Sequence, residues 1–257
     1  MFNLEDFDIK LDTDYIGRNF VYAEEVDSTN GVLMNSAYGF NDHGSVLLAE
    51  KQLKGRGRQN RTWQSQKDLN LTFSILLKDQ SLFTSGFTLL VFGAANVVAA
   101  SIENLYQLRT EVKWPNDVLV NGKKVAGILI ESSSQGQKIV RAVVGVGLNV
   151  NQQAFHGQFQ IQPTSLKNEL NQNIEREVLL AEILNIFEEM LGKYKTEPEQ
   201  ILKDWRMRCR MIGEKIDVND GKNSRHGIFD DVDENGTLLL RTEKGIEKIN
   251  FGDVSIR

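Results

Sequence analysis

The chain has 257 residues, of which 40% are hydrophobic and 25% are charged, and its formal net charge is −5. This length allows a sizeable core in one large domain or in one domain plus a small one, and the negative charge argues against a dominant nucleic-acid-binding surface. A single cysteine, Cys209, permits no internal disulfide. The first 14 residues lack the basic segment and apolar run of a signal peptide. We therefore expect a cytoplasmic protein, monomer or homodimer.

The first predicted elements are strands and a short helix. Residues 20–26 have the composition of a strand, and Ser28 then suits the N-cap of a helix that runs to about residue 38. Residues 45–50 and 69–77 are typical of strands, because apolar side chains alternate along the second one.

Residues 83–102 contain no charged side chain, so the stretch is long enough to consider a membrane helix. Polar residues interrupt it, and small apolar residues dominate from residue 87 onward. We expect a buried helix from 87 to about 107 and no membrane association.

Residues 113–131 predict a hairpin around Asn121-Gly122, because both turn positions of such a hairpin favour positive φ. Pro115 cannot donate a ladder hydrogen bond, so the first strand should begin after it. An apolar strand over 139–150, an ordered loop over 152–162 and helices over 177–194 and 198–208 should follow.

The pattern changes after residue 211, where short strands alternate with turns at 219–221, 234–236 and 244–245. This spacing indicates a small β-barrel, which is too short to be stable alone and should pack on the main domain. The expected division is a main α+β domain over 1–210 and a small β-barrel over 211–257.

Two stretches combine charge with glycine in an unusual way. Gly55 to Trp63 joins two glycines, three arginines and a tryptophan, which suits a mobile loop that closes on a phosphate-bearing aromatic ligand. An RNA-binding loop or a merely solvated basic loop is the alternative. Lys113, Asp117 and Lys124 crowd the hairpin, where they line either an anion site or a solvated sheet edge.

Six motifs together resemble the biotin protein ligases, in the order and with the spacing of that family from about residue 22 to 150. They are Asp27-Ser28-Thr29-Asn30, Ala49-Glu50-Lys51-Gln52 leading into Gly55-Arg56-Gly57-Arg58, Arg61-Thr62-Trp63, Lys113-Trp114-Pro115-Asn116-Asp117, Lys124-Val125-Ala126-Gly127-Ile128-Leu129 and Gly145-Val146-Gly147-Leu148-Asn149.

The resemblance implies a mixed β-sheet catalytic domain flanked by helices, of the class II synthetase or biotin ligase type, with a small C-terminal SH3-like barrel. It also implies a reaction of biotin with ATP and Mg²⁺ to biotinyl-5′-AMP, followed by acyl transfer to a lysine of a biotin carboxyl carrier protein domain. Two anions must meet in the first step, so fixed positive charge is needed. The resemblance assigns catalytic roles to Arg56, Arg58, Lys124 and Asp117, with no metal site fixed by the protein alone.

The remaining residue roles also come from the resemblance. Biotin would contact Ser28, Thr29, Asn30, Gln52, Gly55, Arg56, Lys124, Gly127, Leu129 and Gly147. The nucleotide would contact Arg58, Arg61, Trp63 and Asn149. Ordinary structural roles stay open: a helix cap at Ser28, a core position for Trp63, an exposed hairpin lysine at Lys124 and a salt bridge at Asp117.

The chain departs from the family pattern at Gln59-Asn60, where many members have glycine. Asparagine tolerates the left-handed conformation, so the loop should keep its shape. The acidic residues 1–14 argue against DNA binding. A lipoate-type ligase, or a non-enzymatic binding protein or regulator, is the alternative function.

Overall fold

The centre of the molecule is a seven-stranded mixed sheet in the order β1-β2-β3-β7-β6-β5-β4. A computed structural model describes residues 2–83, 87–220 and 223–256. β1 and β2 pair in parallel, and the other neighbours pair antiparallel. The strands are β1 Phe20–Val26, β2 Val46–Gln52, β3 Leu71–Leu77, β4 Thr110–Lys113, β5 Asp117–Val120, β6 Lys123–Gln135 and β7 Lys138–Leu148.

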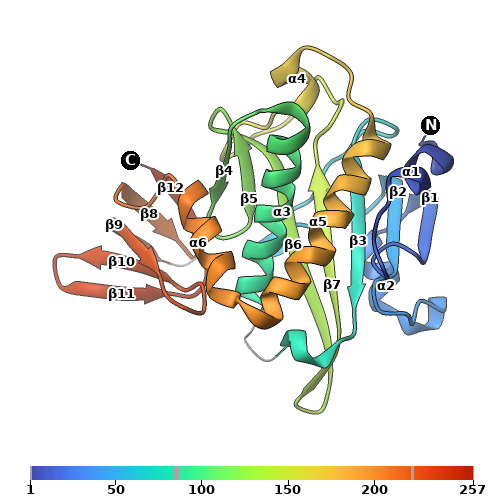
Figure 1. Ribbon diagram of the computed structural model, residues 1–257. Helices are drawn as coiled ribbons and strands as arrows, with labels where there is room; N and C mark the ends of the chain where they lie inside the picture. Colours follow the sequence, from blue (N-terminus) through green and yellow to red (C-terminus); the bar gives the residue numbers. More distant parts are fainter. Residues whose placement is uncertain (1, 84–86, 221–222, 257) are drawn as a thin grey trace.

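Helices cover both faces of this sheet, which confirms the α+β prediction. The long helices α3 Thr88–Tyr106, α5 Arg176–Thr196 and α6 Pro198–Arg208 pack together in front of it (Figure 1). The short helix α2 Thr29–Met34 packs on β3 and β7. The remaining helices are α1 Leu4–Lys10, which packs on α5, α4 Leu166–Leu170 and the 3₁₀ turns Ser36–Tyr38, Arg58–Asn60 and Gln80–Phe83.

Successive side chains of β3 point to opposite faces of the sheet. Phe73 and Ile75 belong to the large core under the long helices. Leu76 instead joins a second small cluster with Leu33 of α2. The residues of β3 on the same side as Leu76, Thr72 and Ser74, therefore face α2.

Most predicted elements are confirmed, with one premature ending. The helix expected to reach residue 38 ends at Met34, because Asn35 takes an extended conformation and caps the following 3₁₀ turn with its side chain. Ser28 caps α2 as predicted, with its hydroxyl accepting from the Gly31 amide at 3.4 Å. The pattern gave no indication of α1, β4 or α4.

Helix α3 matches the predicted buried helix, although residues 84–86 of the uncharged stretch lie outside the described residues. It is long and apolar enough to cross a membrane by length and composition. Its side chains nevertheless lie between the sheet and helices α5 and α6, and Phe92 stacks on Trp205 at 4.2 Å between ring centroids. The burial within the fold accounts for its apolar composition.

The predicted C-terminal barrel is wrong in one respect: within the described residues it is an open antiparallel sheet. Its order is β11-β10-β9-β8-β12, and the short edge strands β11 and β12 pair only with their inner neighbours. Residues 250–252 alone connect these edges, a reach of about 14 Å, whereas the outer strands of a flat five-stranded sheet stand about 19 Å apart. The sheet is therefore strongly curved. The strands are β8 Lys215–Asn219, β9 Ser224–Val232, β10 Leu238–Thr242, β11 Gly245–Ile249 and β12 Asp253–Ile256.

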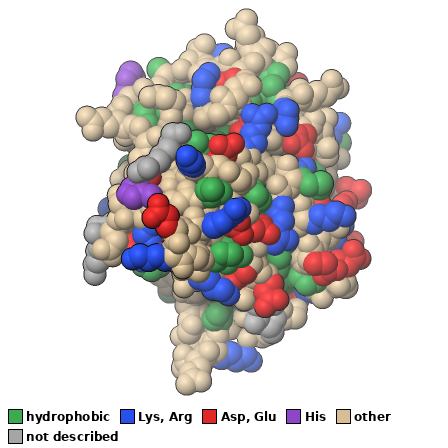
Figure 2. Space-filling model, turned by 90° about the vertical axis from the view of Figure 1, so that its left-hand side faces the viewer, with side chains coloured by type: hydrophobic (Ala, Val, Ile, Leu, Met, Phe, Trp, Pro, Cys, Tyr) green, Lys and Arg blue, Asp and Glu red, His purple; other side chains and the backbone are tan. Residues whose placement is uncertain are grey.

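This second sheet packs on the main domain, as predicted. Its apolar side chains, including Phe229 and Leu240, continue the large core. Trp114 is buried and donates from Nε1 to the Gly236 carbonyl at 3.1 Å, and Arg206 of α6 donates to the Val232 carbonyl. On the face seen in Figure 2, basic and acidic side chains intermingle instead of forming a patch of one sign.

Candidate active site

A cavity of about 550 Å³ opens on the sheet face that carries α2, opposite the long helices. Strands β3, β5, β6 and β7 form its floor. The 56–64 loop, residues 155–161 and Asp253 of the C-terminal sheet form its walls. Sequence segments that are far apart therefore meet here.

The strands of the floor contribute few side chains of their own, because glycines stand opposite one another. Strand register places Asp117 beside Gly127, Gly127 beside Gly147, and Gly147 beside Thr72. Cross-strand neighbours share a face, so the four form one row across β5, β6, β7 and β3. A flat ligand can approach the backbone along this row.

A register shift in β5–β6 brings Lys124 onto the same face. Asp117 pairs with Gly127 and Val118 with Ala126, but Leu119 pairs with Lys124, so Val125 is the extra residue of a bulge. Bulges of this kind redirect side chains beside sites. The Lys124 ammonium lies 3.2 Å from the position that a Cβ on Gly127 would take.

The predicted basic loop is a tight hairpin. The Gly57 amide donates to the Arg61 carbonyl at 2.7 Å, and the Trp63 amide donates to the Gly55 carbonyl at 3.0 Å. Gln59 and Asn60 have φ of 54° and 58°. Asn60 thus adopts the left-handed conformation that asparagine tolerates, and Gln59 adopts it as well.

Trp63 lies on the glycine floor. A Cβ on Gly147 would come within 2.2 Å of the indole, and one on Gly127 within 3.4 Å. The Lys124 ammonium stands 5.6 Å from the ring centroid, within cation–π range. The buried indole N–H has no hydrogen-bond partner among the described residues.

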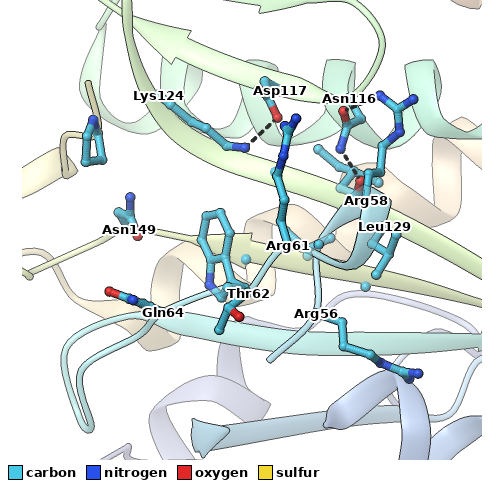
Figure 3. Close-up of a pocket in the computed structure, with 18 of the residues that line it drawn as sticks. Arg56, Arg58, Arg61, Thr62, Gln64, Asn116, Asp117, Lys124, Leu129 and Asn149 are labelled. Atoms are coloured by element: carbon cyan, nitrogen blue, oxygen red, sulfur yellow. Dashed lines mark hydrogen bonds and ion pairs between the residues drawn. The ribbon is translucent and has the colours of Figure 1, made fainter. Parts of the chain in front are cut away.

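Three cations of the cavity lining pair with carboxylates. Lys124 pairs with Asp117 at 2.7 Å, as Figure 3 shows, and Arg56 pairs with Glu131 at 3.0 Å. Arg61 forms two contacts with Asp253.

Arg58 donates to the Asn116 side chain at 3.3 Å. Desolvation lowers the pKa of Arg58 and that of Lys113, although Asp117 and Asp253 act in the opposite direction at both. Incompletely compensated positive charge of this kind favours an incoming anion.

Polar side chains join at the opposite end of the cavity in a buried hydrogen-bond network. The Thr29 amide donates to Gln52 Oε1 at 2.8 Å, and Ser74 Oγ lies 2.7 Å from Thr29 Oγ1 and 2.6 Å from Asn30 Oδ1. The Asn30 amide nitrogen donates to the Glu131 carboxylate at 2.8 Å. The network thus extends from Gln52 to Glu131, which also pairs with Arg56.

Most of the residues predicted for the site come together at this cavity. Its lining includes Ser28, Thr29, Asn30, Gln52, Arg56, Arg58, Arg61, Trp63, Asp117, Lys124, Gly127, Leu129, Gly147 and Asn149. Gly55 is not in the lining: a Cβ there would lie 2.3 Å from the Trp63 carbonyl oxygen, so this glycine lets the two arms of the loop approach. Asn149 is buried and donates to the Thr164 carbonyl at 3.0 Å.

Sequence reasoning missed several contributors. Thr72 and Asp253 line the cavity, and Ser74 and Glu131 support it from behind. Strand alternation could have indicated Thr72 and Ser74, whereas no local signal points to Asp253. Residues 152–162 form a loop, as predicted, and the Lys124 amide donates to the Gln162 carbonyl at 2.9 Å.

The carboxylates in the lining, Asp117 and Asp253, are each engaged by a cation. Among the described residues no group of three or more His, Cys, Asp or Glu side chains could hold a metal ion. A divalent ion at this cavity would therefore depend on oxygen ligands from a bound phosphate as well as on the protein.

Comparison with known proteins agrees with this geometry. The description "Biotin/lipoate A/B protein ligase family" matches residues 22–149, and "Biotin protein ligase C terminal domain" matches residues 211–257. The chain is 32% identical to the bifunctional ligase/repressor BirA of Bacillus subtilis, over 96% of this chain and 76% of that protein. It is also 32% identical to the biotin–[acetyl-CoA-carboxylase] ligase of Paracoccus denitrificans, over 89% and 96% of the two chains.

A solved structure is similar throughout. It is the biotin protein ligase from Aquifex aeolicus in complex with biotin and ATP, with a TM-score of 0.81, 30% identity and coverage of 93% of this chain and 99% of that one. The chain belongs to the biotin protein ligase family and is an ATP-dependent ligase of biotin.

Proposed function

We propose that this cavity joins the biotin carboxylate to the α-phosphate of ATP and then passes the biotinyl group to a lysine of a biotin carboxyl carrier protein domain. The observation that carries the proposal is the row of Asp117, Gly127, Gly147 and Thr72, with a hydrogen-bond network at one end and cations at the other. The flat ring of biotin matches the hydrogen-bond network, its aliphatic chain matches the glycine row, and its charged reacting end matches the cations.

In the first step the biotin carboxylate attacks the α-phosphorus and pyrophosphate leaves. Lys124 holds a carboxylate oxygen, while Arg58 and Arg61 exchange their present partners for phosphate oxygens. Charge that develops on the phosphoryl group is then met by these cations. Trp63 and Asn149 contribute to the nucleotide side.

Mg²⁺ would bind together with the triphosphate and neutralise part of its charge. The lysines and arginines of this chain hold the two reacting anions in the right orientation. Such orientation lowers the activation free energy of a reaction between two bound groups.

In the second step the carrier lysine attacks the acyl carbon of the adenylate and AMP leaves. Asp117 lies 2.7 Å from Lys124 and can accept a proton from the attacking amine. The name of the Paracoccus relative supports a carboxylase carrier domain as the acceptor.

We further propose residues 1–210 as the catalytic domain and residues 211–257 as a separate unit that supplies Asp253. Cytoplasmic location, the monomeric or dimeric state and the lack of DNA binding stay predictions. A gel-shift assay with duplex DNA, biotin and ATP at physiological salt tests the last of these; sequence-specific submicromolar binding would contradict it.

The decisive assay is biotin-dependent exchange of radiolabelled pyrophosphate into ATP, with lipoate as the control substrate. We expect exchange with biotin and none with lipoate at equal concentration. The lipoate control is needed because the matched family includes lipoate ligases. Exchange with lipoate alone would overturn the proposal.

A further inference from the structure

Ser74 connects two side chains of the cavity wall but does not itself line the cavity. Its side chain is fully buried, and Thr29 and Asn30 are 3% and 4% exposed. The Ser74 oxygen lies 2.7 Å from Thr29 Oγ1 and 2.6 Å from Asn30 Oδ1. A serine hydroxyl has one proton, so it can donate to only one of them.

The orientation of the Asn30 amide decides which one. Its nitrogen faces two acceptors, the Leu129 carbonyl at 3.2 Å and the Glu131 carboxylate at 2.8 Å. A flipped amide would put oxygen against both, which is unfavourable. Asn30 Oδ1 therefore faces Ser74, and because it can only accept, Ser74 donates to it.

The Thr29 hydroxyl is fixed as a consequence. The proton of Ser74 is committed to Asn30, so the 2.7 Å contact between Ser74 and Thr29 requires Thr29 to donate. Gln52 Oε1 accepts from the Thr29 amide and also lies 3.1 Å from the same hydroxyl, but the single Thr29 proton is taken by the shorter 2.7 Å contact with Ser74. Thr29 then presents only lone pairs to the cavity.

We propose that Ser74 is a positioning residue that sets the specificity of the site by holding the Thr29 hydroxyl as an acceptor. The site then takes a ligand N–H at this point and rejects a ring oxygen, and so distinguishes a cyclic urea from a cyclic carbamate. This inference rests on the proposed function, in which the ring is the ureido ring of biotin. Asn30 acts through the same network, since both of its amide hydrogens are engaged within the protein.

The test compares biotin with its two carbamate isomers, in which one or the other ureido N–H is replaced by oxygen. Dissociation constants are measured by calorimetry. The wild-type protein should bind one isomer roughly 10- to 100-fold more weakly than biotin, because two acceptors then face each other without a proton. Comparable binding of biotin and both isomers would overturn the inference without any variant.

Variants separate positioning from general damage. In Ser74→Ala the Thr29 hydroxyl can turn and donate, so the preference for biotin over the disfavoured isomer should shrink to within about threefold. Thr29→Val should lose the preference as well, because it has no acceptor. Ser101→Ala is the matched control: Ser101 is also buried and donates only to the Val97 carbonyl in α3, so the preference should be unchanged.

The outcomes are distinguishable from a failure of the proposed function. A wild-type protein that binds no biotin would contradict the proposed function and this inference with it. Biotin binding with an undiminished preference in Ser74→Ala would contradict the role of Ser74 alone.

Discussion

The two ends of the cavity differ in how their polar groups are held. At the Thr29 end, nearly fully buried side chains bond to one another, and each orientation follows from its neighbour. At the arginine end, the Arg61 side chain is 46% exposed and is held by Asp253, a carboxylate that an anion can replace.

The difference indicates a division of labour. Buried networks are rigid and specific, whereas exposed ion pairs are weak and exchange readily. The first end selects the ligand, and the second rearranges around the reacting phosphate.

Gly147→Ala should be the most damaging change, because a Cβ would stand 2.2 Å from the Trp63 indole and block the floor. We expect pyrophosphate exchange to fall by about 100-fold or more, since displacements of about 1 Å can cost that much. Gly192→Ala is the control: a Cβ there meets nothing within 4 Å inside α5. Equal exchange rates in the two variants would contradict a glycine floor.

Lys124→Ala tests the proposed contact between Lys124 and the reacting carboxylate of biotin. A charge-assisted hydrogen bond to the reacting carboxylate is worth roughly 1.5–3 kcal/mol, so adenylate formation should fall by roughly 10- to 150-fold. The melting temperature should change little. Lys123→Ala is matched in residue type: the Lys123 side chain is 51% exposed, pairs with Glu169 and does not line the cavity. If Lys124→Ala formed adenylate at the wild-type rate, the role of Lys124 in holding the carboxylate would be contradicted.

Arg58→Gly tests whether the loop protects the intermediate. The variant should form adenylate but release it, and non-cognate lysines should be labelled several-fold faster, because mixed anhydrides acylate stray amines. Hydrogen exchange of residues 55–63 should slow when biotin and ATP bind to the wild-type protein. Equal protection of this segment with and without the ligands would count against closure.

Local sequence motifs predicted some residues of the site and not others. Motifs within a few residues of one another indicated Lys124, the loop arginines and the floor glycines through a family resemblance. Contacts between residues far apart in the sequence could not be predicted from local motifs. Glu131 meets Asn30 from 101 positions away, and Asp253 meets Arg61 from 192.

The same limit explains the C-terminal sheet. Turn residues indicated its strands, and the short chain indicated that it must pack on the main domain. Whether its edges close depends on hydrogen bonds between β11 and β12, whose pairings within the described residues are with β10 and β8. Strand composition contains no information on that choice.

Asp253→Asn should have the smallest effect and tests the loosely held end most directly. Asp253 pairs with Arg61 in the ligand-free chain, so ATP must displace a carboxylate before its phosphates can reach this guanidinium. Exposed ion pairs contribute about 0.2–1 kcal/mol, so the KM for ATP should fall by roughly 1.4- to 5-fold with kcat unchanged. High salt should reduce the difference, because it screens the pair in the wild-type protein.

Asp230→Asn is the matched control for this last variant, because Asp230 pairs with Arg241 on the same C-terminal sheet and does not line the cavity. Its KM for ATP should equal that of the wild-type protein. A rise in KM for Asp253→Asn would instead mean that the carboxylate holds Arg61 in its productive position. The arginine end would then be preorganised like the Thr29 end, and the contrast between the two would be lost.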